Sequence, residues 1–161
     1  GEEIWVRNGT RVNAGKKYQK KGGWIFTDSL KLCSMGPSTV MVKKDFFLEC
    51  GGFREDYPVC EDYHLWLQMT SQTPVGFIEE PVIVKYGGHE DQLSRQRIAM
   101  SYYRVLAIED VLRKRKLSDV WREEALNELK YKTDILLKGY LKHENMANYE
   151  KILSIQSEWC Q

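Results

Sequence analysis

The pattern of apolar residues changes near residue 97, and this change constrains the fold more than any other feature of the sequence. Before it, apolar residues come in short runs that are often β-branched and are separated by glycine, proline or polar residues. Such runs are typical of strands and short helices. Beyond it, apolar residues recur with the period of an amphipathic helix. The sequence therefore predicts an α/β region over residues 1–96 and a helical extension over residues 97–161.

The first part of the chain is expected to contain short strands, turns and helices. Strand-like runs at 4–6 and 11–12 flank Asn8-Gly9, a dipeptide that is common in tight turns. A β-branched run over residues 39–42 predicts a buried strand. The other expected elements are a short helix capped by Asp28 or Ser29, helices over 45–50 and 60–71, and two extended pieces within 75–86.

Three helices are predicted in the helical extension. The first carries apolar residues at helical spacing from Met100 to Val111. The second covers residues 119–142 and the third about 147–158, and we expect these two to form an antiparallel pair. The stripe expected to bury the second helix consists of Trp121, Ala125, Leu129, Leu136 and Tyr140.

Composition argues against several classes of function. The chain has 24 Lys and Arg against 23 Asp and Glu, and this balance does not favour a nucleic-acid-binding protein. No apolar run approaches the roughly 20 residues of a membrane span, and no signal segment opens the chain, so a cytoplasmic setting is expected. The four cysteines form no Cys-x-x-Cys pair, so we expect reduced, mostly buried thiols. A lysine-containing loop over residues 16–23 is either a solvated surface or a loop that meets a phosphate or an acidic acceptor.

An acid pair opens the helix predicted over residues 60–71, where the helix dipole and free N–H groups favour a carboxylate. Asp62 heads the apolar face of this helix, because positions on one face recur every three to four residues. The other members of that face are Leu65, Trp66 and Met69. Glu61 is expected on a wetter side, together with His64 and Gln68.

Asp62 and Trp66 each allow two interpretations. A carboxylate at this position can cap the helix, and helix physics alone favours that role. Partial burial beside the apolar face would instead suit a general base. Trp66 is either a core side chain or a platform for a sugar ring.

His89 follows Gly87-Gly88, where the chain can approach a ligand closely. Neutral histidine binds metals and also donates hydrogen bonds to phosphates. No second ligand has a suitable spacing, so these residues alone favour a loop histidine without a ligand.

Several segments are more informative together than separately. They read WVRNG at 5–9, GPSTVM at 36–41, GGFRE at 51–55, EDYHLWL at 61–67 and GGHEDQLS at 87–94. In combination they resemble the second half of family 2 glycosyltransferases, bacterial-type enzymes with a GT-A fold, which is a nucleotide-binding α/β domain. The resemblance extends to about residue 96, and the helical extension follows it.

The resemblance implies transfer of a sugar, with inversion, from a nucleotide-sugar to the hydroxyl of a saccharide or lipid-linked acceptor, in the synthesis of a surface polysaccharide or glycolipid. Asp62 falls on the catalytic base of the family, and Glu61 is its partner in the acid pair. His89 falls on a late histidine near the metal–diphosphate unit, where a divalent cation, Mg²⁺ or Mn²⁺, is expected. Trp66 and Gln92 are the candidate substrate-binding residues.

Two features that the family carries upstream of this region do not occur in the sequence. It has no Asp-x-Asp pair, which supplies oxygen ligands for the cation, and no glycine-rich phosphate loop. We therefore expect the acceptor-side half of a GT-A domain, inactive by itself, cytoplasmic or peripheral to the inner membrane. A half-domain leaves a sheet edge and an apolar face uncovered, so a homodimer is expected. His64 stands where close relatives tend to carry Asp, and on a wet side this departure should have a small effect.

A different class of function stays open. In this alternative the chain is a non-catalytic module, whose helical extension binds a partner and whose acid pair is only structural.

Overall fold

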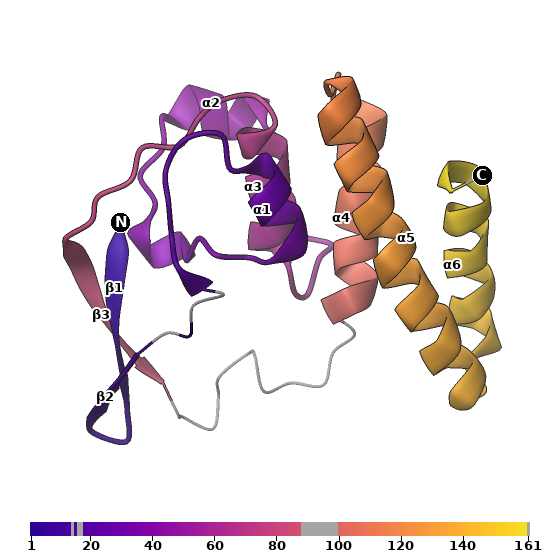
Figure 1. Cartoon of the computed structure of the whole chain (residues 1–161), viewed down its shortest axis with the longest axis horizontal. Helices are drawn as coiled ribbons and strands as arrows, with labels where there is room; N and C mark the ends of the chain where they lie inside the picture. Colours follow the sequence, from indigo (N-terminus) through magenta and orange to yellow (C-terminus); the bar gives the residue numbers. More distant parts are fainter. Residues whose placement is uncertain (14, 16–17, 88–99, 161) are drawn as a thin grey trace. The chain divides into compact units, whose positions relative to one another are not determined.

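The computed structural model describes residues 1–13, 15, 18–87 and 100–160. The chain divides into two compact units, Gly1–Ile98 and Ala99–Gln161, which are described separately. Within the described residues the fold is mixed α/β, with one three-stranded sheet and six α-helices (Figure 1). The predicted α/β class is therefore confirmed at this general level.

The sheet of the first unit consists of β1 (Glu2–Arg7), β2 (Thr10–Val12) and β3 (Pro81–Gly87), in the order β2-β1-β3. β1 pairs with β2 in antiparallel and with β3 in parallel orientation. The β1–β2 turn places Asn8 at φ 51° and Gly9 at φ 75°. Asn and Gly are the residues that tolerate this left-handed backbone, so the sequence determines the predicted hairpin locally.

A nearly buried ion pair joins the sheet to the following loop. Lys20 Nζ lies 3.1 Å from Glu3 Oε2, and the two side chains are only 10% and 5% exposed. Trp5 Nε1 donates a 2.6 Å hydrogen bond to Glu3 Oε1. Burial raises the pKa of Glu3, but the hydrogen bonds from Trp5 and Lys20 and the charges of Lys20 and Lys85 outweigh it, so the pKa lies below its ordinary value.

Replacing Glu3 with Gln should make the protein less stable at pH 7 by roughly 1–3 kcal/mol, because Lys20 loses a buried partner. The lowered pKa of Glu3 means that its contribution is present above the unfolded value of about 4.3 and disappears as pH falls through the folded pKa. Urea unfolding at pH 7 and at acidic pH should show parent and Glu3→Gln converging on acidification. A constant difference, or an equal loss in the exposed control Glu80→Gln, would contradict this account.

One face of the sheet exposes apolar side chains. The strand register places Ile4 beside Val84 and Val6 beside Tyr86 on this face, and Val82 continues it along β3. Val82, Val84 and Tyr86 are exposed, and β3 is an edge strand within the described sheet. This apolar sheet face has no cover among the described residues of its unit.

Short helices surround a central one in the same unit. They are α1 (Phe26–Lys31), the 3₁₀ helix η2 (Pro37–Thr39), α2 (Lys44–Glu49) and α3 (Glu61–Thr70). The predicted helices at 45–50 and 60–71 are confirmed, and α2 ends at Gly51 and Gly52 with φ values of 93° and 62°. The α1 prediction was wrong at its start, because the helix begins at Phe26 and neither Asp28 nor Ser29 caps it.

The strand predicted over residues 39–42 was wrong. Thr39 ends η2, and the following residues belong to no strand. Val40 keeps an extended backbone with φ −105° and ψ 133°, but Met41 is 97% exposed. β-Branched residues favour an extended backbone, whereas a strand also requires a neighbouring strand, and local sequence does not supply one.

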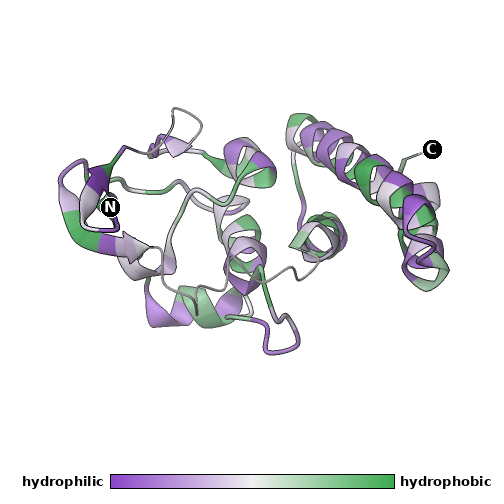
Figure 2. Cartoon of the chain, turned by 90° about the horizontal axis from the view of Figure 1, so that it is seen from below, coloured by the Kyte–Doolittle hydropathy of each residue, from purple (hydrophilic) through white to green (hydrophobic). Residues whose placement is uncertain are grey.

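The second unit is helical, as predicted, with α4 (Met100–Lys114), α5 (Asp119–Lys142) and α6 (Met146–Trp159). Its long helices carry polar and apolar residues side by side along their length (Figure 2). Ser118 caps α5 by accepting a 3.3 Å hydrogen bond from the backbone N–H of Trp121. Asn145 caps α6 in the same way, with Asn148 N as the donor. None of the described helices has the length and apolar content that crossing a membrane requires.

The predicted pairing of α5 with α6 is confirmed, and a polar contact fixes its register. Gln156 on α6 donates hydrogen bonds to Thr133 Oγ1 at 2.9 Å and to Asp134 Oδ1 at 2.6 Å. The buried stripe of α5 consists of Ala125, Leu129, Thr133 and Leu137. Trp121, Leu136 and Tyr140, which we expected on that stripe, are only half-buried. Leu136 and Tyr140 fall outside the four-residue spacing of the buried positions, and Trp121 precedes Ala125 by one turn in the first turn of the helix.

Candidate functional site

The acid pair lies in the first turn of α3, directly after a conformationally unusual residue. Cys60, the residue before the helix, has φ 65° and ψ 19°. This left-handed backbone conformation is uncommon for residues other than Gly, Asn and Asp. Glu61 and Asp62 follow it as the first two residues of the helix. Backbone strain of this kind persists only where the surroundings fix it, so the start of α3 is held in place.

Asp62 is half-buried and has identifiable partners. Its Oδ2 accepts a hydrogen bond from Cys33 Sγ at 3.5 Å, and its Oδ1 accepts one from the backbone N–H of Tyr63 at 2.6 Å. Cys33 lies just after α1, so the contact connects two helices that are distant in sequence. None of the four cysteines, all of which are among the described residues, forms a disulfide bond. Cys50 and Cys60 are buried, while Cys33 and Cys160 are half-buried.

Trp66 lies one turn beyond Asp62 and is only 4% exposed. Its Nε1 donates a 3.0 Å hydrogen bond to the carbonyl oxygen of Met35, and its ring meets Phe53 edge to face. The predicted apolar face is therefore a core cluster. The cluster contains Cys50, Leu65, Trp66 and Met69, with Cys33, Met35, Val40, Phe46 and Phe47 packed against it.

The wetter side that we predicted for α3 does not exist. His64 and Gln68 are both buried, as is every residue of the helix from Tyr63 onward. Tyr63 Oη donates a 2.6 Å hydrogen bond to the carbonyl oxygen of Leu30, so α1 packs against α3. The expectation failed because side-chain polarity does not reveal how many neighbours surround a helix.

His64 also differs from expectation in its surroundings. Its ring packs edge to face against Tyr57 at 5.4 Å, and the Arg54 guanidinium lies 4.5 Å from the centre of the Tyr57 ring. Arg54 forms an ion pair with Asp56. The pKa of Asp56 lies below its ordinary value mainly because Arg54 donates a hydrogen bond to its carboxylate. A substitution at His64 would therefore alter packing, and the small effect expected for an exposed position no longer follows.

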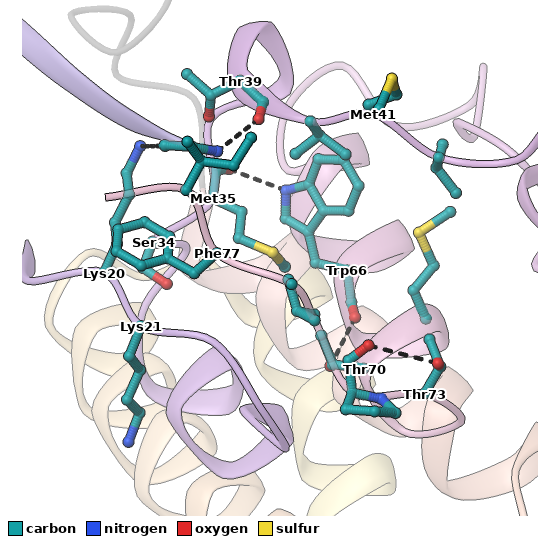
Figure 3. A pocket seen from close by; sticks show the side chains of 18 of the residues that line it. Lys20, Lys21, Ser34, Met35, Thr39, Met41, Trp66, Thr70, Thr73 and Phe77 are labelled. Carbon is teal, nitrogen blue, oxygen red and sulfur yellow. Dashed lines mark hydrogen bonds between the residues drawn. The ribbon is translucent and has the colours of Figure 1, made fainter. Parts of the chain in front are cut away.

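A cavity of about 520 Å³ lies beside the core cluster. Figure 3 shows Trp66, Met35 and Phe77 among its lining side chains. Two backbone hydrogen bonds between Gly23 and Val75, of 2.7 and 2.9 Å, tie together the two loops that form much of its wall. Gly22 permits this approach, since a Cβ there would lie 2.8 Å from the carbonyl oxygen of Val75.

Trp66 is the one predicted site residue that lines the cavity among the described residues, and Met69 of the predicted apolar face and Lys20 and Lys21 of the lysine-containing loop line it as well. Asp62 does not line the cavity. Met35 lies between Asp62 and the cavity, because its carbonyl oxygen accepts from Trp66 Nε1 and lies 3.8 Å from Cys33 Sγ, the donor to Asp62. The missed residues include Phe77 and Ile78, which lie in the loop between α3 and β3. In the sequence these residues form a short apolar run, which we interpreted as part of an extended piece rather than as the wall of a cavity.

The described residues contain no cluster of candidate metal ligands. No three His, Cys, Asp or Glu side chains within this part of the chain are placed to hold a metal ion. The predicted metal ligand His89 and the predicted substrate-binding residue Gln92 both lie outside the described residues. The chemistry considered below therefore uses only Asp62 and its neighbours.

Comparison of the chain with protein-family models, with curated proteins and with solved structures returned no significant match.

Proposed function

We propose that this chain forms the acceptor side of an inverting glycosyltransferase with a GT-A fold. The observation that carries the proposal is the placement of Asp62, a half-buried carboxylate in the first turn of α3, held by Cys33. The sequence segments that resemble family 2 glycosyltransferases add to it, and they assign the role of base to the same residue. In that role Asp62 takes the proton of an acceptor hydroxyl while the hydroxyl oxygen attacks the anomeric carbon of the donor, and the bond from that carbon to the diphosphate oxygen breaks so that the nucleotide leaves.

The contacts of Asp62 suit a base. A thiol is a weak hydrogen-bond donor, so the Cys33 contact orients Oδ2 without using its full accepting capacity. Each carboxylate oxygen has two lone pairs, and one partner on each oxygen leaves a site where an acceptor hydroxyl can donate. Asp62 also lies in the first turn of α3, near the positive end of the helix dipole.

Glu61 is the weaker candidate for the same role. It is half-buried, like Asp62, but it precedes Asp62 by one position and so lies about a quarter of a turn away on the helix. We propose that it supports the site without taking the acceptor proton. The proposed roles of His89 in cation binding and of Gln92 in substrate binding rest on the sequence resemblance alone.

The 161 residues alone should not bind a nucleotide-sugar. Their sequence contains no Asp-x-Asp pair and no glycine-rich phosphate loop, so they lack the groups that would hold a diphosphate. Calorimetric titration with a panel of nucleotide-sugars, with and without Mg²⁺ or Mn²⁺, should give no saturable heat. Saturable binding in the micromolar range would contradict the expectation that donor binding requires residues outside this chain. It would also contradict the proposed role of this region as the acceptor side.

The chain should also associate with itself at micromolar concentration. The apolar sheet face exposes Val82, Val84 and Tyr86 of β3, and within the described residues β3 has no neighbouring strand on its outer side. Light scattering should therefore report a mass near that of a dimer. Val84→Lys should return it to the monomer, whereas Val120→Lys, at an exposed valine of α5, should not. A monomeric parent chain would remove this expectation.

A second function has some support from α5. Tyr131 and Ile135 are exposed and four positions apart, so they lie on one face of the helix. Such a pair could bind a partner helix in a non-catalytic module. The two functions separate experimentally, because Asp62→Asn should strongly reduce transfer by the complete enzyme but leave partner binding unchanged.

A further inference from the structure

The wall of the cavity offers few unused polar groups. Three of its polar side chains already donate hydrogen bonds to backbone carbonyl oxygens. These bonds run from Trp66 Nε1 to Met35, from Thr70 Oγ1 to Trp66 and from Thr39 Oγ1 to Gly36. Most of the remaining lining side chains are aliphatic, aromatic or thioether groups. A sugar ring inside would lose its hydrogen bonds to water without replacement, which costs free energy for every buried hydroxyl. The chemistry of the interior therefore selects an apolar group.

The charges around the cavity are of one sign. Lys20, Lys21 and Lys43 line it, and no Asp or Glu of the described chain does. Glu3 neutralises Lys20 in a nearly buried ion pair. Lys21 forms an ion pair with Asp28 at an exposed position, where such pairs contribute little to stability. Lys43 is exposed and forms no ion pair with the described residues. An anion at the rim would therefore be attracted mainly by Lys43.

From these two observations we infer that the cavity binds a single-chain amphiphile, an apolar chain that ends in a carboxylate or phosphate. The apolar chain of the ligand lies against Trp66, Met35 and Phe77, which Figure 3 shows in the wall of the cavity. The anionic head lies beside Lys43. A volume of about 520 Å³ is within the range of small-molecule sites. The inference does not depend on glycosyl transfer, since Asp62 does not line the cavity.

The experiment is calorimetric titration with decanoate, decyl phosphate and decanol, each below the concentration at which it forms micelles. We expect saturable binding of one decanoate or decyl phosphate per chain and several-fold weaker binding of decanol. The two anions distinguish a carboxylate head from a phosphate head. Equal affinity for decanol would overturn the assignment of the head group, and no saturable binding of any of the three would overturn the whole inference.

Matched variants locate the two ends of the ligand. Lys43→Gln should weaken decanoate binding by about two- to fivefold, the size of one exposed ion pair, while Lys44→Gln at the next residue should not. Val42→Asp adds a carboxylate to the cavity lining and should weaken binding by about tenfold or more. Leu48→Asp, at an exposed leucine of α2 that does not line the cavity, is its control. Equal losses in a variant and its control would overturn the proposed position.

A lipid surface is the competing occupant, because lysines beside exposed apolar residues also attract anionic membranes. Flotation with vesicles of anionic and of neutral phospholipid separates the two. Binding to anionic vesicles in the absence of decanoate binding would overturn the inference in favour of a membrane surface. Decanoate binding without flotation supports it.

Discussion

Asp62→Asn is expected to reduce the turnover of the complete enzyme by about 10²–10⁴, the usual contribution of a general base. Asn keeps the shape of Asp, and its side-chain oxygen can still accept from Cys33 or from the N–H of Tyr63. It cannot take a proton from an acceptor hydroxyl. Affinity for the donor should change little, because Asp62 acts on the acceptor.

Glu61→Gln is the matched control, since it makes the same chemical change at the adjacent position. It should reduce turnover much less. Circular dichroism and urea unfolding of both variants establish that the fold is intact, so that a loss of turnover can be assigned to chemistry. Near-parent turnover in Asp62→Asn, or an equal loss in both variants, would remove Asp62 as the base.

Leu129→Ala should reduce the free energy of unfolding by roughly 2–5 kcal/mol, the second large effect. Leu129 is fully buried on the α5 stripe, and its neighbours one turn away, Ala125 and Thr133, are buried as well. Truncation removes the burial of the side chain and leaves a space that helices already fixed by packing close only in part.

Urea unfolding gives the measurement, with a lower midpoint and an unchanged slope as the expected result. Leu141→Ala is the control on the same helix, because Leu141 is 53% exposed and its truncation should cost no more than about 0.5 kcal/mol. Similar losses of unfolding free energy in both variants would show that the buried stripe of α5 does not stabilise the helical unit.

Elements with local causes were the ones that the sequence predicted well. The β1–β2 hairpin depends on the turn at Asn8 and Gly9, α2 ends at two glycines, and α5 begins at a serine cap and then follows its periodicity for 24 residues. Each of these causes lies within a few residues of its effect. A single sequence therefore contains enough information to predict them.

Features that depend on distant neighbours were predicted poorly. The run at 39–42 has the composition of a strand but lacks a neighbouring strand, and His64 is polar but buried. The cavity joins loops that precede α1 and follow α3, so no single segment could predict it. Sequence did place Asp62 at the head of the apolar face, since helical periodicity is local, but it gave no indication that Cys33 would be its neighbour.

The contact between Cys33 and Asp62 also provides a spectroscopic probe that needs no label. The stretching vibration of a thiol absorbs in a region of the infrared spectrum where the rest of a protein is almost transparent. Its frequency falls as the hydrogen bond that the thiol donates becomes stronger, and a charged carboxylate accepts more strongly than a neutral one. The Cys33 band should therefore move to higher frequency in Asp62→Asn, where a neutral amide replaces the carboxylate, and Cys33→Ser should delete that band while leaving the bands of the other three cysteines in place.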